Sequence, residues 1–437
     1  MTKVLFIAPI SVCGAPVSGG EQRTRLIFDA LAWRYDVDAM VVGAGVNQMH
    51  KAPFVRAASV HEALHASPGA MLFGSLYPRL QINIADKIAA ALLPRVRAYA
   101  PDALMTASLA NVDFSAYDLI VSRFLRPAAR TGALAASIGA SGRGTPVIVD
   151  VDDRDDHVFA SRLERNRFNP ALGALNRWHA AQARAIMRDR LPAARHLWFV
   201  SEDDMRDVDH ASMSVLANIP YGAPPHDVAP PDSKAGVKTI LFAGHAGHEP
   251  NRQGLMRFLR NCWPKIAARA PDAMLRIIGS GWEGLPADLA ARVRVERAGF
   301  VDDLAAEYRR AHFVVSPVYE GAGVKIKVIE ALAHGRAVVA DSHSARGFPE
   351  KLRADCIVSA AGDKEMVEAC LRLLVDPDEA ARRGLAGRAH ALASYTRERF
   401  EEIVVSDCER VLAQAASPKP SAVSAAVLRE RTDVRTG

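Results

Sequence analysis

Short apolar runs alternate with longer stretches of helical periodicity through the first half of the chain. The stretches between the runs, such as Glu21–Tyr35 and Ser161–Arg190, have helical character. Strands that alternate with helices indicate a parallel sheet covered on both faces. The segment 44–101 has no clear assignment. The predicted strands are KVLFIAPI (3–10), DVDAMVVG (36–43), YDLIVSRF (117–124), TPVIVDVDD (145–153) and HLWFVSEDD (196–204).

The same alternation starts again near residue 238, so we expect a second Rossmann-like domain. A helix is predicted over Asn251–Ala268, and another follows Gly323. The strands predicted here are KTILFAG (238–244), AMLRIIGSG (273–281), VRVERAGFV (293–301), AHFVVSPVY (311–319), RAVVAD (336–341) and ADCIVSA (354–360).

Composition sets the boundaries between the parts of the chain. Residues 223–236 contain four prolines and no apolar periodicity, which predicts a linker. The first domain then spans 1–222 and the second spans 237–395, with a closing helix at 396–415. Residues 416–437 have little to bury and are expected to form a mobile tail.

The bulk composition is that of a soluble globular protein: 49% of the 437 residues are hydrophobic and 24% are charged. The five cysteines include no close pair, which argues against a disulfide framework or a zinc site and favours a reducing cytoplasm. We interpret the apolar start as a buried strand rather than a signal sequence, and no apolar stretch is long enough to span a bilayer. The net charge of +6 suits phosphate-bearing ligands or an anionic membrane surface without specifying either.

A glycine-rich loop, GAPVSGGEQRTR, joins the first strand to the first helix. It is not a G-x-G-x-x-G fingerprint, so a dinucleotide site is poorly supported. Adjacent glycines before a helix still let backbone N–H groups approach a phosphate, and we predict such a loop at Gly19, Gly20 and Arg23. A turn that merely needs positive φ angles explains the glycines equally well.

The segment YEGAGVKIKVIEALAHG, from Tyr319 to Gly335, places charged residues where a buried strand ends and a helix begins. A helix start offers free N–H groups to an anion, and lysines add positive charge. Glu330 lies on the helical face of Lys327 and has the acceptors that a ribose needs. The alternative is an ordinary surface ion pair; the glycines make us favour ligand binding. The predicted anion-binding residues are Gly321, Gly323, Val324, Lys325 and Lys327.

Three more strand ends of the second domain carry similar loops, and together they line one sheet edge. The motifs FAGHAGHEPN, IIGSGW, AGFVDD and VYEGAGVKIK, in this order and with the N-terminal SGGEQRTRLIFDAL, resemble family 4 glycosyltransferases of the GT-B fold. The resemblance covers Lys3 to about Leu412. It implies two facing Rossmann-like domains, with a nucleotide diphosphate sugar held mainly by the second and an acceptor by the first. The donor-binding residues implied in these loops include Gly244, His245, Gly279, Phe300 and Val301.

One departure from the family concerns its pair of glutamates. The family usually separates them by seven residues, whereas nine separate Glu320 from Glu330 here. Glu330 precedes ALAHG as the second glutamate does and so inherits the ribose role, while the place of the first falls on Ala322. Either Glu320 reaches the donor sugar by another path, or the backbone of 321–324 serves instead. A branch of the family with a G-x-G-x-K-x-K loop has this pattern, so we predict catalytic roles for Glu320 and Lys327.

The acid-rich strand end VIVDVDDRDDHVF is a second candidate site. By composition, Asp150, Asp152 and Asp153 have the oxygen ligands that a divalent metal needs. The resemblance instead puts this strand end at the cleft, with Asp152 at the place of a family histidine and Asp153 at that of an acid. We favour acceptor binding or catalysis by Asp152 over a metal site, with a solvated strand end as the plain alternative.

The stretch from Ser161 to Arg195 contains eight arginines interleaved with apolar residues. It is either an amphipathic surface for a membrane or, more commonly, a core-facing helix with a solvated side. Nucleic-acid binding is the weakest interpretation because no recognised module accompanies the charge.

Together these features predict a cytoplasmic glycosyltransferase of the hexosyltransferase type, at the inner face of the membrane if the basic stretch binds there. By resemblance the reaction retains the anomeric configuration and needs neither metal nor cofactor. Bacterial polysaccharide or lipid-linked glycan synthesis is the expected setting, with a sugar or lipid-linked sugar as acceptor. Two alternatives stay open: a nucleotide-sugar 2-epimerase of the same fold, and a nucleotide-sugar-binding protein that has lost catalysis.

Overall fold

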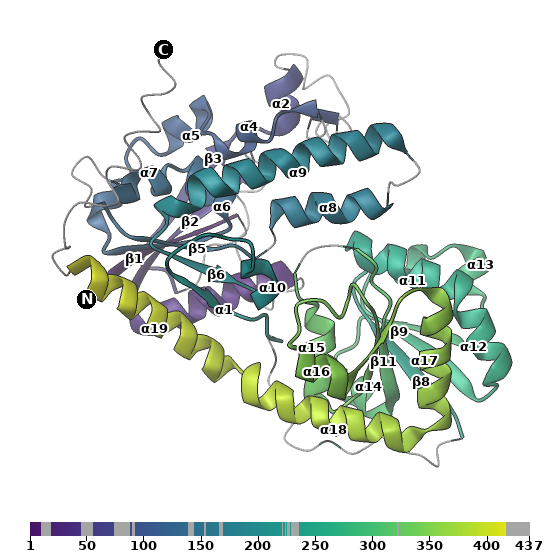
Figure 1. Cartoon of the computed structure of the whole chain (residues 1–437). Coiled ribbons are helices and arrows are strands. Elements are labelled where there is room, and N and C mark those ends of the chain that lie inside the picture. Colours follow the sequence, from purple (N-terminus) through teal and green to yellow (C-terminus); the bar gives the residue numbers. More distant parts are fainter. Residues whose placement is uncertain are drawn as a thin grey trace.

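The chain forms two parallel β-sheets, each with helices on both faces (Figure 1). The computed structural model describes residues 1–9, 19–44, 56–73, 88–89, 92–138, 144–152, 154–165, 169–220, 222, 224, 228, 236–320 and 323–416. The prediction of two Rossmann-like domains with a helical C-terminal segment is confirmed. The predicted tail from residue 417 onward and most of the predicted linker lie outside the described residues.

The first sheet runs in the order β3-β2-β1-β4-β5-β6-β7. Its central strands are apolar runs buried on both faces, as expected for a parallel sheet between two helical layers. The strands are β1 (Lys3–Ala8), β2 (Asp36–Ala44), β3 (Val60–His65), β4 (Leu119–Arg123), β5 (Val147–Asp150), β6 (His196–Phe199) and β7 (Met213–Val215).

The two edge strands, β3 and β7, were not among the predicted strands. β3 reads VHEALH and is only partly buried, because it pairs with β2 on one side and lies at the sheet edge. An edge strand needs no continuous apolar run, so its sequence gives a weak signal. The helices of this domain are α1 (Gly19–Arg34), α2 (Pro68–Phe73), α4 (Val96–Tyr99), α5 (Ala103–Ser108), α6 (Leu125–Arg130), α7 (Ala133–Ile138), α8 (Asp155–Arg165), α9 (Pro170–Arg190) and α10 (Glu202–Met205), with 3-10 turns at Phe114–Ala116 and Leu191–Ala193.

The second sheet runs in the order β10-β9-β8-β11-β12-β13, and each of its strands falls on a predicted one. Its strands are β8 (Lys238–Ala243), β9 (Ala273–Ile278), β10 (Val295–Gly299), β11 (Ala311–Ser316), β12 (Val338–Asp341) and β13 (Ile357–Ala360). Its helices are α11 (Glu249–Asn261), α12 (Trp263–Arg269), α13 (Ala287–Ala290), α14 (Leu304–Arg310), α15 (Ile326–Ala333), α16 (Glu350–Cys356), α17 (Asp363–Val375) and α18 (Pro377–Ser394), with a 3-10 turn at Trp282–Gly284.

The single helix predicted over 251–268 is two helices that break at Cys262. Pro264 lies in the first turn of α12, where its missing N–H costs nothing, whereas inside a continuous helix it would remove a hydrogen bond.

The last helix, α19 (Arg397–Ala416), returns to the first domain and packs along α1 (Figure 1). Phe400, Val404 and Cys408 of α19 are buried in the core that α1 forms with the first sheet. The C-terminal segment therefore spans both domains, with α18 on the second and α19 on the first.

The carboxyl ends of the strands of both sheets lie close to the boundary between the domains. Asn218 Nδ2 donates to the Val324 carbonyl at 3.5 Å, and the Gly347 N–H donates to Asp203 Oδ2 at 3.2 Å. Val200, which follows β6, is buried in a core cluster made otherwise of second-domain residues and Tyr395. These contacts bring the predicted donor loop against the first domain.

Candidate active site at the domain boundary

The loop before α15 has the backbone that its glycines predict. Gly323 has a φ angle of 70°, which residues with a Cβ atom rarely adopt. Val324 is buried, and Lys325 immediately precedes the helix, with its Nζ 3.2 Å from the Gly323 carbonyl. The free N–H groups of the first turn of α15 and two lysine side chains therefore occur within one short segment. Gly321 lies outside the described residues.

Lys327 lies in the first turn of α15 and is largely removed from solvent. Its Nζ donates to Asn251 Oδ1 at 2.6 Å and lies 4.6 Å from the centre of the Phe242 ring. Burial, helped by the charge of Lys325, lowers the pKa of Lys327 to about 7. Burial disfavours the charged ammonium, and an anionic ligand beside it would stabilise that charge.

The loops after β8 and β9 pack against this lysine. A Cβ added at Gly244 would lie 2.9 Å from both Lys327 Nζ and Asn251 Nδ2, so a larger residue here would require these side chains to move. Gly279, with a φ of 113°, packs on the Gly244 carbonyl, which accepts a hydrogen bond from Trp282 Nε1 at 2.7 Å. His245 Nδ1 lies 2.9 Å from Ser280 Oγ. The structure therefore brings the predicted residues Gly244, His245 and Gly279 together with Lys327.

Glu330 lies one turn further along α15. Tyr308 donates its hydroxyl to Glu330 Oε2 at 2.9 Å, and the Tyr308 ring stacks on His334 with centroids 4.4 Å apart. Burial raises the pKa of the Glu330 carboxyl from its ordinary value, against the opposing effects of Tyr308 and Lys327. The carboxylate has acceptor sites beyond the one that Tyr308 uses.

Sequence reasoning missed Asn251 and Tyr308, which hold Lys327 and Glu330 in place. Asn251 ends the FAGHAGHEPN motif, and its polar side chain at the start of a predicted helix was the available signal. Tyr308 looks like an ordinary core residue of α14, so nothing in the sequence pattern distinguishes it.

Other predicted donor residues have less distinct surroundings. Val301 is partly buried against the core cluster that includes α15, whereas Phe300 is 74% exposed. Glu320 is part-exposed directly before the two residues that the structure does not describe. The roles predicted for these three residues stay predictions.

The predicted phosphate role of Arg23 disagrees with its surroundings. Arg23 is 1% exposed, and its guanidinium donates to both oxygens of Asp150, at 2.6 and 2.9 Å. The remaining nitrogen donates to the Leu216 carbonyl and to Asn218 Oδ1. Four of the five N–H groups of this buried guanidinium donate to protein acceptors, so it is poorly placed to bind a phosphate.

Asp152 follows β5 and belongs to the same buried cluster. Its Oδ2 accepts from Arg123 at 2.9 Å, and Arg123 also pairs with Asp150. Burial would raise the pKa of the Asp150 carboxyl, but Arg23 and Arg123 outweigh it and hold that pKa below its ordinary range. These arginines already supply the positive charge that a metal would bring, and Asp153 lies outside the described residues.

The start of α1 lies against the start of α15. A Cβ added at Gly19 would approach Ile326 Cδ1 to 3.0 Å, so the first residue of α1 lies against the first residue of α15. The Gly20 carbonyl accepts from Thr24 Oγ1 at 2.7 Å within α1.

A cavity of about 240 Å³ lies between the domains. Its walls come from α8 and α10 on one side, and from Gly323 and the loop after β12 on the other. The lining residues are His157, Ala160, Ser161, Ser201, Asp203, Asp204, Gly323, His343, Arg346 and Gly347.

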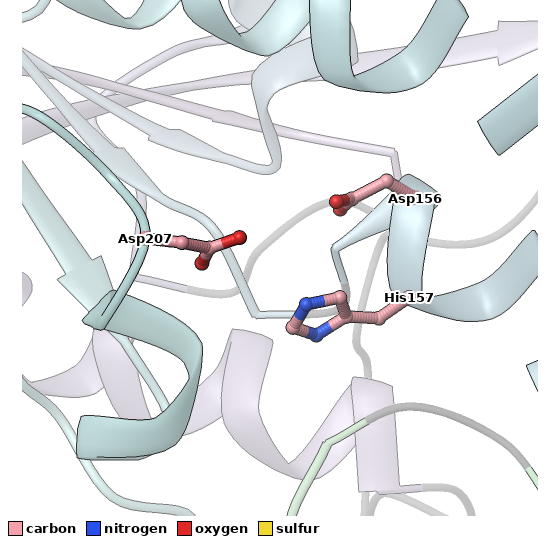
Figure 2. A group of neighbouring side chains, drawn as sticks. All are labelled: Asp156, His157 and Asp207. Atoms are coloured by element: carbon pink, nitrogen blue, oxygen red, sulfur yellow. The ribbon is translucent and has the colours of Figure 1, made fainter. Parts of the chain in front are cut away.

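Asp156, His157 and Asp207 form a cluster beside this cavity, with ligand atoms within 4.8 Å of one another (Figure 2). Arg154 donates to both carboxylates, at 2.9 and 3.1 Å to Asp156 and at 3.0 Å to Asp207 Oδ2. The guanidinium occupies the place of a cation, so we assign no metal to the cluster.

The basic stretch predicted to be a membrane surface or a solvated helix forms α8 and α9. Ile186 and Met187 are buried in the first-domain core, whereas Leu172 and Trp178 are exposed. Among the helices that the structure describes, none combines the length and hydrophobicity needed to cross a bilayer. Part of the apolar stripe is therefore core, and α9 carries its exposed residues beside several arginines.

With this geometry in hand, known proteins provide a comparison. Residues 237–376 match the model of a family described as "Glycosyl transferases group 1". This match covers most of the second domain. The matched segment runs from β8 to the end of α17 and so contains Gly244, Lys327 and Glu330.

A phosphatidyl-myo-inositol mannosyltransferase of Mycobacterium tuberculosis is 38% identical over 109 residues, which are 24% of this chain and 28% of that protein. The matches to the curated relatives span less than a third of those proteins' own length. These matches therefore relate the chain to the curated relatives through one segment only.

Two solved structures resemble the chain along almost its whole length. A sucrose-phosphate synthase from Thermosynechococcus elongatus has a TM-score of 0.62 and 16% identity, with 95% of this chain and 100% of that chain covered. A structure described as "Trehalose-6-phosphate from E. coli bound with UDP-2-fluoro glucose" has a TM-score of 0.58 and 12% identity, with 93% and 98% covered. The fold is GT-B, as the sequence resemblance implied.

Proposed function

We propose that this protein transfers a glycosyl group from a nucleotide diphosphate sugar to an acceptor hydroxyl. The observation that carries the proposal is the start of α15 at the domain boundary, where Lys327 meets the Gly244 loop and Tyr308 holds Glu330 one turn further along. The match of most of the second domain to the group 1 glycosyltransferases supports it. So does the UDP-2-fluoro glucose in the E. coli structure of the same fold.

In this proposal the helix start and its lysines hold the diphosphate. Negative charge grows on the leaving nucleoside diphosphate as the glycosidic bond breaks, and Lys325, Lys327 and the N–H groups of α15 stabilise it. The diphosphate in turn favours the charged form of Lys327. Glu330, fixed by Tyr308, accepts hydrogen bonds from the ribose.

We also propose that transfer needs no metal and retains the anomeric configuration. The positive charge that a metal would bring to the diphosphate is supplied by two lysines and a helix N-terminus. Retention follows the sequence resemblance. Glu320 is assigned to the donor sugar, and the cavity between the domains is assigned to the reacting groups.

The acceptor is assigned to the first domain, where Asp152 and Arg123 lie at the carboxyl edge of the sheet. We place the reaction in the cytoplasm, in bacterial polysaccharide or lipid-linked glycan synthesis. Contact with the inner membrane face is assigned to the exposed side of α9, where Leu172 and Trp178 lie beside arginines.

The experiment is a transfer assay with the purified full chain. A panel of nucleotide diphosphate sugars is combined with sugar, sugar phosphate and lipid-linked acceptors, in EDTA, and products are identified by mass spectrometry. We expect a new glycoside and one nucleoside diphosphate per transfer. Epimerised sugar without acceptor would favour the epimerase, and activity that requires added manganese or magnesium would contradict metal independence.

A further inference from the structure

A second cavity, of about 290 Å³, lies within the first domain. It opens where β1, β2, β3, β4 and β5 end, the edge of a parallel sheet where ligands bind. Its described walls are mostly apolar, and the charged residues among the described lining are three arginines and one carboxylate. The lining residues are Pro9, Val42, His65, Tyr99, Phe124, Leu125, Arg126, Pro127, Arg130, Val151, Arg154, Asp155 and Met187.

The charges around this cavity leave a positive excess at one wall. Arg95 and Arg126 share the single carboxylate Asp155, at 2.7 and 2.8 Å, while Arg130 pairs with Asp102 at 2.6 Å. Three guanidinium groups therefore share two carboxylates. Arg154 pairs with two aspartates, neither of which lines the cavity.

Two of the lining arginines also hold donors that the protein leaves unused. The Nε atoms of Arg126 and Arg130 are buried, and neither has an acceptor among the described residues. A buried N–H without an acceptor costs free energy that a bound oxyanion would recover. Planar guanidinium groups bind phosphate through paired N–H donors, which suits these arginines to such a ligand.

Backbone strain marks the same place. Phe124 lines the cavity with a φ angle of 64°, which is rare for a bulky residue. It is fixed by a hydrogen bond from its N–H to the Asp150 carbonyl at 2.8 Å and by the Arg123 guanidinium, 4.4 Å from its ring centre. Such strain persists where surrounding contacts enforce it, and it concentrates at ligand sites.

The start of α8 lies between this cavity and the cavity at the domain boundary. Arg154 and Asp155 line this cavity, and His157, two residues further along, lines the cavity that reaches Gly323. The Arg154 guanidinium donates to the backbone carbonyl of Asp204, and Asp204 Oδ1 lies 3.2 Å from His157 Nδ1. The two cavities are therefore lined by neighbouring residues, Arg154 and Asp155 in one and His157 in the other.

We propose that this cavity binds the phosphate group of a phosphate-bearing acceptor, through Arg126 and Arg130, while its apolar walls hold the adjoining part of that molecule. The identification of the bound molecule as an acceptor rests on the proposed function, whereas the phosphate site itself does not. The volume of the cavity is near the lower end for small-molecule sites, which suits one phosphate group attached to a molecule the size of a monosaccharide.

The test measures binding of inorganic phosphate and glucose 6-phosphate by calorimetry, with glucose as the neutral match. Arg126→Met is the main variant, because its side chain is 42% exposed and Asp155 keeps Arg95 and Tyr99 as partners. We expect it to weaken phosphate binding by about tenfold or more. Arg126→Lys keeps the positive charge but loses the paired N–H donors of the guanidinium. Its phosphate affinity should lie between those of the wild type and Arg126→Met.

Arg269→Met is the matched control, since it removes an exposed arginine from a surface pair of the second domain. It should leave phosphate binding unchanged. Sedimentation with phosphatidylinositol vesicles, against phosphatidylcholine alone, identifies the source of the phosphate: Arg126-dependent binding to the vesicles indicates a lipid headgroup, and binding to glucose 6-phosphate alone indicates a free sugar phosphate.

The inference is overturned if none of these phosphate probes binds, or if they bind Arg126→Met as tightly as the wild type, as they would at the lysines of α15. UDP, GDP and ADP binding to Arg126→Met should match the wild type. Absence of phosphate binding to the wild type, with nucleotide binding present, defeats only this inference. Absence of nucleotide binding to the wild type, with an Arg126-dependent phosphate site present, defeats only the proposed donor function.

Discussion

Lys327 is the residue whose charge the account depends on most. Its ammonium has a pKa of about 7 because it is buried, so above that pH the free protein holds it mostly neutral. A bound diphosphate favours the charged form. We therefore predict that nucleoside diphosphate binding at about pH 8 takes up most of one proton, measured as the dependence of calorimetric enthalpy on buffer ionisation.

Lys327→Met should abolish this proton uptake, and an unchanged uptake would contradict the assignment. The sign of the stability effect is also fixed. Between pH 7 and the ordinary lysine pKa of 10.5, Lys327 carries a proton in the unfolded chain that it lacks in the folded chain. The contribution of Lys327 to the stability of the ligand-free protein should therefore rise with pH through this range, measured as the difference between the wild type and Lys327→Met.

Substitution of Asp152 tests whether the first domain handles the acceptor and the second domain binds the donor. Asp152→Asn keeps the size of the side chain but removes the charge that Arg123 contacts at 2.9 Å. We predict that transfer falls by ~10²-fold or more while donor affinity stays unchanged. Asp189→Asn, an exposed carboxylate on α9, is the control. Loss of donor binding with normal transfer per bound donor would show that the domain roles are reversed.

The sequence pattern put Lys327, Glu330 and the Gly244 loop at strand ends of the second sheet, where the structure has them, because glycines and charges at a strand end have a specific physical use. Their roles in ligand binding stay predictions. The sequence did not allow prediction of the surroundings of Arg23. An arginine beside two glycines suggests a phosphate contact, whereas the partners of Arg23 in the structure, Asp150 and Asn218, come from distant segments of the chain. Pairing between buried polar groups depends on tertiary contacts that a linear pattern does not contain.

Helix α19 is the element that joins the two domains. Buried Asp407 accepts from Trp198 Nε1 at 2.8 Å, from Ser214 Oγ at 2.6 Å and, when the ring nitrogen carries a proton, from His196 Nε2 at 3.1 Å. These partners and Arg410 hold the pKa of the Asp407 carboxyl below its ordinary value despite burial. The carboxylate therefore anchors α19 to β6 and β7.

Asp407→Ala should lower the free energy of unfolding by about 3–5 kcal/mol, because it leaves buried donors without an acceptor. Urea unfolding followed by circular dichroism measures the effect. Glu409→Ala on the same helix removes only an exposed pair with Arg34 and should cost about 0–1 kcal/mol. Equal losses in the two variants would refute the anchoring role.

At the scale of the whole molecule, the order of strands and helices was predictable because buried parallel strands are short apolar runs. The edge strand β3 escaped prediction, since one exposed side removes that signal. The two cavities were also beyond the sequence. Each collects residues from several strand ends, and only the folded chain shows that Arg126 and Asp155, or Gly323 and His157, line the same space.

The most direct test of the account is calorimetric titration of the full chain with UDP, GDP and ADP. The wild type should bind at least one of them, and Glu330→Ala should weaken that binding by about 1.5–3 kcal/mol through loss of hydrogen bonds to a charged group. Glu368→Ala, an exposed carboxylate of the same domain, should bind like the wild type. Failure of all three nucleotides to bind the wild type, or equal affinity for a folded Glu330→Ala, would contradict the account.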